Sequence, residues 1–152
     1  MHLGTYIGLA HQSEKQLAKA LRLVADKHGS EPDIYHTCQL LAAWSEAHEA
    51  GLATFVARYS EARETEPERL MASLFDKPRA GELGLLRDLH DLWLLTQEVN
   101  MSWKVIVQAA RLLRDQELEN ACLAFEAETH RQADWLQTRI KQAAPQILVV
   151  AS

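Results

Sequence analysis

Residues 34–59, IYHTCQLLAAWSEAHEAGLATFVARY, decide the fold of this chain. Apolar residues recur every three or four positions in this stretch, which is the spacing of one face of an α-helix. The face consists of Ile34, Cys38, Leu41, Ser45, His48, Leu52, Phe55 and Tyr59. A helix of this length hides its apolar face by packing against other helices. We therefore expect a helical bundle, and we note that Ser45 and His48 interrupt the face near its middle.

Three further stretches have the same spacing and complete a set of four predicted helices. We place the helices at about residues 3–28, 33–62, 82–115 and 116–143, separated by breaks that contain Gly or Pro. Asp33 follows Pro32 and is the expected N-cap of the second helix. A tight turn near residues 114–117 joins the last two helices, and Pro145 is expected to end the last one.

The lengths of the connections set the expected topology. The short break near Gly29 makes the first two helices an antiparallel hairpin, and the last two helices form another. The connection from Arg63 to Arg79 carries its own apolar residues, Leu70, Met71, Leu74 and Phe75. At about 3.3 Å per residue it can run the length of a bundle, which favours a long crossover between the hairpins. An up-down-up-down bundle with a loose middle loop is the alternative.

Composition limits the class of protein and its partners. The chain has 152 residues, of which 47% are hydrophobic and 24% are charged, and this suits one all-α domain over residues 1–144. A formal net charge of -5 without a basic block argues against nucleic-acid and membrane partners. We expect neither a signal peptide nor a membrane span. Because Cys38 and Cys122 cannot form a disulfide framework, we expect a cytoplasmic protein.

Residues 145–152 form an apolar C-terminal tail that contains Ile147-Leu148-Val149-Val150. Such a run promotes aggregation when it is exposed. We expect it to pack on its own bundle, and docking on another chain is the alternative. The long helices also suggest a homodimer or larger homo-oligomer, with Trp44 or Trp93 at the contact.

Polar residues interrupt the apolar face of each predicted helix near its midpoint. These residues are Glu14, Ser45, His48, Thr96, Glu128 and Gln132. Midpoints share one level in an antiparallel bundle, so Glu14, His48 and Glu128 are predicted to meet there. Burying these groups unpaired costs several kcal/mol, so they need a common partner. A divalent cation such as iron or zinc is one solution, and a network of hydrogen bonds without metal is the other.

Glu49, Glu98 and His130 are weaker candidates for metal ligands. Glu49 lies close to the interruption in the second helix and could turn inward, whereas Glu98 reaches the site only if the third helix rotates. His130 is expected to pair with Glu126 on the surface. His28, in the last turn of the first helix, is expected to interact with the helix dipole.

The first helix also carries a family resemblance. Its segment Ser13-Glu14-Lys15-Gln16-Leu17-Ala18-Lys19-Ala20-Leu21 resembles the signature of bacterial stress-response ferritin-like proteins, which is close to AEKQLLKAL. The resemblance covers residues 3–60 and, more loosely, residues 117–140. It implies a ferritin-like four-helix bundle, with two antiparallel hairpins joined by a long crossover. It also implies a di-iron pattern with a Glu on two helices and Glu-x-x-His on the other two.

This chain departs from the di-iron pattern. Glu14, His48 and Glu128 match three of the six ligands, while Ser45 replaces the Glu of the second-helix motif and Arg131 replaces the His of the fourth-helix motif. At the expected level the third helix offers Thr96 or Val99, which are not ligands of that pattern. The incomplete set implies one weakly bound ion, or none, rather than two irons. The guanidinium of Arg131 could supply positive charge in place of a metal.

Two functions follow from these observations. The first is a ferritin-like protein that binds iron or another divalent metal at Glu14, His48 and Glu128, with a link to stress response. If the ion is iron, the expected chemistry is oxidation by dioxygen or peroxide. The second is a non-catalytic bundle that has lost its metal site and acts as an interaction or oligomerisation module. The sequence contains no phosphate-binding loop, CxxC, HExxH or nucleophile elbow that would favour another enzyme class.

Overall fold

The computed structural model describes residues 1–60 and 74–150, and this part of the chain is helical with no strand. Its elements are α1 (Leu3–Lys27), α2 (Pro32–Arg58), α3 (Gly81–Leu113), α4 (Gln116–Pro145) and a short π-helix, η2 (Gln146–Val150). The four predicted helices are confirmed, and most of their bounds agree within two residues; α2 ends four residues earlier than expected. No helix in the described residues is long and apolar enough to cross a membrane.

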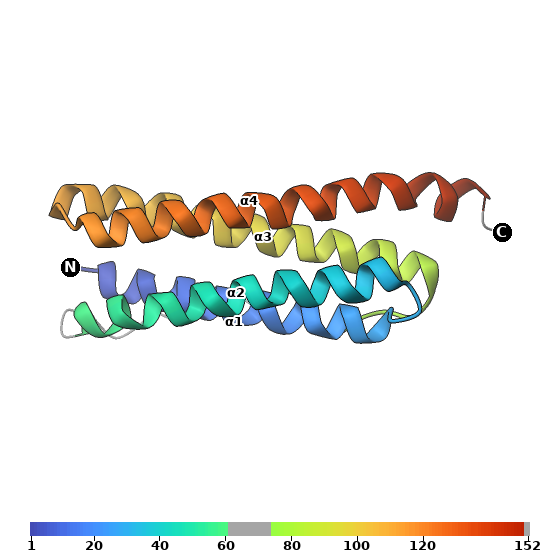
Figure 1. Ribbon diagram of the computed structural model, residues 1–152, viewed down its shortest axis with the longest axis horizontal. Helices are drawn as coiled ribbons and strands as arrows, with labels where there is room; N and C mark the ends of the chain where they lie inside the picture. The colour runs from blue at the N-terminus through green and yellow to red at the C-terminus, as the bar shows by residue number, and fades with distance from the viewer. Residues whose placement is uncertain (61–73, 151–152) are drawn as a thin grey trace.

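The helices form a bundle of two antiparallel hairpins, α1–α2 and α3–α4, that lie side by side (Figure 1). His28 at the end of α1 contacts Asp88 near the start of α3, with 2.8 Å between Nε2 and Oδ2. Arg139 near the end of α4 contacts Asp33 at the start of α2, with 2.6 Å between Nε and Oδ2. These contacts show that α2 and α3 run in one direction and that α1 and α4 run in the other.

The parallel arrangement of α2 and α3 excludes the up-down-up-down alternative. α2 ends and α3 begins at opposite ends of the bundle (Figure 1), as the expected crossover requires. Most of that connection, including Leu70 and Met71, lies outside the described residues. Of its apolar residues inside the described part, Phe75 packs against the core, whereas Leu74 is 47% exposed.

The starts of two helices are explained by their first residues. Glu31 is the N-cap of α2 and Pro32 is its first residue, where the missing N–H of proline is not needed. The prediction of Asp33 as the cap was therefore wrong; its carboxylate lies in the first turn, where it suits the helix dipole. The turn between α3 and α4 is as tight as predicted, with Arg114 in the left-handed conformation at a φ of 56°. Asp115 then caps α4 by accepting the N–H of Leu118 at 3.1 Å.

The core consists largely of the predicted apolar faces. Fully buried side chains come from all four helices: Ile7, Leu17, Leu21, Ile34, Leu52, Leu89, Leu92, Trp103, Ile106, Leu118 and Leu136. Each burial of this kind contributes about 1.5–3 kcal/mol. Leu113, the last residue assigned to the core face of α3, is 43% exposed instead because it lies at the very end of that helix.

The C-terminal tail differs from the prediction in two ways. The chain remains helical through Pro145 and continues into η2, so the expected break is absent. η2 prolongs α4 beyond the end of the bundle (Figure 1), and Leu148, Val149 and Val150 are 62%, 81% and 66% exposed. The expected packing of the tail on its own bundle is therefore not formed for these three side chains.

We predict that Gly4→Ala lowers the free energy of unfolding by about 1–3 kcal/mol, because a core contact becomes overpacked. A Cβ at Gly4 would lie 2.4 Å from the backbone oxygen of Tyr59, so α1 and the end of α2 would have to move apart. Urea denaturation measures the change. Gly29→Ala is the matched control, since its Cβ would meet no atom closer than 3.5 Å. Equal stabilities of the two variants would contradict the close helix approach.

Candidate functional site

His48 lies between two carboxylates in the middle of the bundle. Its Nδ1 is 3.2 Å from Oε1 of Glu14, and its Nε2 is 3.2 Å from Oε1 of Glu128. The structure thus brings together, from α1, α2 and α4, the three residues that the polar layer singled out. We call them the Glu14–His48–Glu128 triad. Glu14 and His48 are 0% and 1% exposed, whereas Glu128 is 41% exposed and opens one side of the triad to solvent.

Two neutral polar residues complete the cluster around Glu14. Ser45, one turn before His48 on α2, hydrogen-bonds the Glu14 carboxylate. Gln132 on α4 donates its amide N–H groups to Ser45 Oγ and to the backbone oxygen of Leu41, both at 2.9 Å. The sequence pattern identified both residues as polar interruptions but did not include them among the site residues. Their proximity to Glu14 became evident only from the packing of α2 against α4.

Two oxygen atoms of this cluster are buried without a hydrogen-bond partner in the described part of the structure. They are Oε2 of Glu14 and Oε1 of Gln132, and both belong to side chains that hydrogen-bond Ser45. A buried acceptor without a partner costs about 1–3 kcal/mol. The cluster therefore has spare acceptor capacity on the Glu14 side of His48, and a cation or a proton donor would use it.

Aromatic rings enclose the imidazole of His48. The ring of Phe125 is 4.8 Å from it, and the ring of Trp103 is 6.3 Å away and perpendicular to it, measured between centroids. Trp103 donates its indole N–H to Thr129 Oγ1 at 3.0 Å, and Thr129 donates to the backbone oxygen of Phe125 at 2.8 Å. These rings keep water away and strengthen the electrostatic interactions of the triad.

The surroundings of Glu14 and His48 favour the protonated forms of these two residues. Burial raises the pKa of Glu14, against the effect of its hydrogen bonds to His48 and Ser45. For His48, burial opposes the charged form, but hydrogen bonds and charge interactions with Glu14 and Glu128 outweigh burial and raise its pKa. An imidazolium that donates one N–H to each carboxylate is one way to satisfy this geometry.

A single metal ion cannot bind His48 and both carboxylates in this arrangement, because the two carboxylates contact opposite nitrogens of the ring. Accordingly, the described residues contain no group of three or more His, Cys, Asp and Glu side chains arranged to hold a metal ion. Arg131 is exposed, and the described contacts include no ion pair between it and Glu128. When His48 is protonated, it supplies positive charge beside Glu128.

The weaker candidates lie outside the triad. Glu49 is 3.9 Å from His11, measured between Oε1 and Nε2. Glu98 hydrogen-bonds Ser13, and burial raises its pKa. His130 forms the predicted surface pair with the carboxylate four residues before it, at 3.8 Å. None of these contacts involves the triad.

A second buried cluster surrounds Asp88, which is 0% exposed. Asp88 accepts the backbone N–H of Arg79 at 2.9 Å and its guanidinium at 2.8 Å, and it pairs with His28 at 2.8 Å. The prediction for His28 included only an interaction with the helix dipole and did not include Asp88 as its partner. Asp88 was not singled out, although it lies on the buried face of α3 between Leu85 and Leu89. The cluster fixes the segment before α3 against the end of α1.

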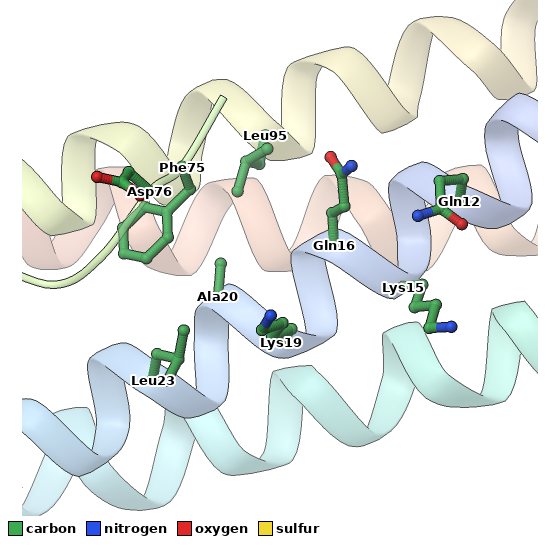
Figure 2. Close-up of a pocket in the computed structure, with 9 residues that line it drawn as sticks. All are labelled: Gln12, Lys15, Gln16, Lys19, Ala20, Leu23, Phe75, Asp76 and Leu95. Atoms are coloured by element: carbon green, nitrogen blue, oxygen red, sulfur yellow. The ribbon is translucent and has the colours of Figure 1, made fainter. Parts of the chain in front are cut away.

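A hollow of about 260 Å³ lies along α1, and none of the triad residues lines it (Figure 2). Its lining residues are Gln12, Lys15, Gln16, Lys19, Ala20, Leu23, Phe75, Asp76 and Leu95. This lining includes one carboxylate and neither histidine nor cysteine. It therefore lacks a set of metal ligands, and the triad remains the stronger candidate site.

Comparisons of the chain with protein-family models, curated proteins and solved structures found no match.

The raised pKa values of Glu14 and His48 predict that metal-free protein becomes less stable as pH rises. A group with a higher pKa in the folded state binds protons more tightly there. Its contribution to the free energy of unfolding is therefore complete at low pH and is lost as the pH rises to the folded-state pKa. For His48 this loss begins near its ordinary value of 6.5. Each group contributes a slope of at most about 1.4 kcal/mol per pH unit.

Urea denaturation in the presence of a chelator, at several pH values from below 6.5 upward, measures this slope. The Glu14→Gln/His48→Gln double variant should show a flatter profile, because it keeps similar side-chain volumes and removes both titrations. A profile equally steep for the double variant would contradict the assignment of the slope to the triad.

Proposed function

We propose that this chain is a ferritin-like protein that binds one divalent metal ion on the Nδ1 side of His48. The observation that carries the proposal is the pair of buried oxygens without partners, Glu14 Oε2 and Gln132 Oε1, beside Ser45. A cation there would give both oxygens a partner. It would also replace the proton that the triad otherwise needs.

The residues around Ser45 suit such an ion. Glu14 supplies a carboxylate and His48 an imidazole nitrogen, while Ser45 and Gln132 supply neutral oxygens. This mixture of one nitrogen and several oxygens is compatible with Fe²⁺, Mn²⁺ or Zn²⁺. Thiolate ligands are not expected, since burial raises the pKa of Cys38 and of Cys122 to about 12 and keeps both thiols protonated.

In this proposal Glu128 positions His48 rather than binding the ion. Its carboxylate lies 3.2 Å from Nε2 and accepts that N–H, which leaves the Nδ1 lone pair free for a metal. A carboxylate behind a ligating histidine fixes the tautomer and the ring orientation. The exposed side of Glu128 also gives the proton at Nε2 a route to solvent.

The resemblance of residues 13–21 supports the ferritin-like part of the proposal and extends it to a role in stress response. Iron, when bound, would supply oxidation by dioxygen or peroxide. The chain itself would orient His48, hold a proton at Nε2 and exclude water through Trp103 and Phe125. Two unpaired cysteines suit a reducing compartment, and we include the cytoplasm in the proposal.

Metal binding by the intact chain tests the proposal. Zn²⁺, and Fe²⁺ under nitrogen, should each bind in a one-to-one ratio by calorimetry, more tightly as pH rises because the ligands must lose protons. Glu14→Gln should weaken binding at least about 100-fold, and Glu128→Gln about 10–100-fold. Glu126→Gln, on the same helix as Glu128 but outside the triad, is the matched control.

The same experiment separates the proposal from the non-catalytic alternative. If the chain has lost its metal site, neither ion binds to it in stoichiometric amount. Equal affinity of the Glu14→Gln variant and the unmodified chain would show that the metal binds elsewhere.

A further inference from the structure

The outer face of α3 carries a stripe of exposed apolar side chains. The stripe consists of Leu83, Leu94, Met101, Val105 and Leu112, which are between 39% and 86% exposed. At about 100° per residue these five positions lie within an arc of about 40° on the side of α3 opposite its buried face. α3 thus has two apolar faces, and the bundle covers only one of them. We call the exposed face the α3 stripe.

The spacing of the α3 stripe indicates a helical partner. Leu94 and Met101 are one heptad apart, as are Val105 and Leu112, and four residues separate the two pairs, so these four positions share one helix face as the residues of a coiled-coil seam do. The stripe extends over nearly the whole helix, about 44 Å at 1.5 Å per residue. A partner that covers all of it must therefore be a long helix.

The sequence of the stripe matches itself when it is read in the reverse direction. Leu83 and Leu112 are equally far from the midpoint between Gln97 and Glu98, and so are Leu94 and Met101. From this symmetry we infer that α3 is the interface of an antiparallel homodimer whose two-fold axis passes between residues 97 and 98. In that arrangement Leu83 meets Leu112 of the second copy, and Leu94 meets Met101 of the second copy.

Charge favours the antiparallel direction over the parallel one. In a parallel pair the two copies of Arg87 would face each other, and so would the two copies of His90. In the antiparallel pair Arg87 lies opposite Gln108 and His90 lies opposite Val105, so like charges are separated. Glu98, the acidic residue nearest the axis, is turned toward Ser13 of α1 by a hydrogen bond.

Antiparallel pairing also brings together the other exposed apolar features of the chain. An apolar groove of about 400 Å³ lies between the start of α1 and the end of α3, and Val105 and Leu112 line it together with Leu3 and Tyr6. The exposed tail residues of η2 lie at the opposite end of the bundle, where η2 contacts α3. In the antiparallel pair, the end of one copy that carries the exposed η2 residues lies beside the end of the other copy that carries the apolar groove.

The oligomeric state of the full chain tests this interface. Sedimentation equilibrium across the micromolar range should show a dimer. Leu94→Glu/Met101→Glu should raise its dissociation constant at least about 100-fold, because four charges enter the seam. Leu40→Glu/Leu123→Glu changes two leucines that are 53% and 41% exposed on α2 and α4, and it should leave the constant nearly unchanged. Circular dichroism verifies that both variants remain folded.

Disulfide cross-linking tests the direction of the pairing. Leu94→Cys/Met101→Cys should form a cross-linked dimer under mild oxidation, because these two positions face each other across the axis. Leu94→Cys alone should not, since its two copies are separated by a heptad. Three results would overturn the inference: a monomer at every concentration, a dimer that the two glutamates do not weaken, or cross-linking of the single variant as fast as that of the double variant.

Discussion

The fold depends on one constraint, namely that two carboxylates and an imidazole inside the bundle must satisfy one another. His48 does this by placing each ring nitrogen 3.2 Å from a carboxylate on a different helix. Breaking the buried Glu14–His48 pair costs about 3–5 kcal/mol, because an uncompensated charge remains, whereas the pair with the 41% exposed Glu128 contributes less. A shift of α1 or α4 by one helical turn relative to α2 would remove a partner of His48. The triad therefore fixes the axial register of these three helices, which apolar packing alone specifies less strictly.

The periodic part of this structure was predictable from the sequence. Apolar spacing located the four helices and nearly all of the core, and the polar interruptions located Glu14, His48 and Glu128. Periodicity identifies which face of a helix is buried, but it does not identify which side chains on neighbouring helices meet. For this reason the hydrogen bond from Gln132 to Ser45 and the pairing of Asp88 with His28 and Arg79 became visible only in three dimensions. Local chemistry caused the remaining errors, since Pro32 begins α2 and Pro145 does not end α4.

In our proposal the triad is stabilised either by a proton on His48 or by a divalent cation on the Nδ1 side of that ring. Without an ion, an imidazolium between two carboxylates satisfies both nitrogens of His48 but leaves Glu14 Oε2 and Gln132 Oε1 without partners. A cation on the Nδ1 side would serve those oxygens and would leave Glu128 to hold Nε2. In this proposal the two states differ in protonation and in the bound ion. Proton uptake and ion release are therefore expected to be linked at this site.

α3 differs from the other helices in what it contributes to this centre. At the level of the triad it supplies Thr96, whose hydroxyl donates to the backbone of Trp93, and the indole of Trp103. Its carboxylate at this level, Glu98, hydrogen-bonds Ser13 rather than a member of the triad. The position of α3 is fixed instead by Asp88 near its start and by apolar packing along its length. A helix without a role in charge neutralisation can carry a second apolar face without disturbing the triad. The α3 stripe lies on that helix, so the association we propose and the metal binding we propose use different surfaces and are separable by mutation.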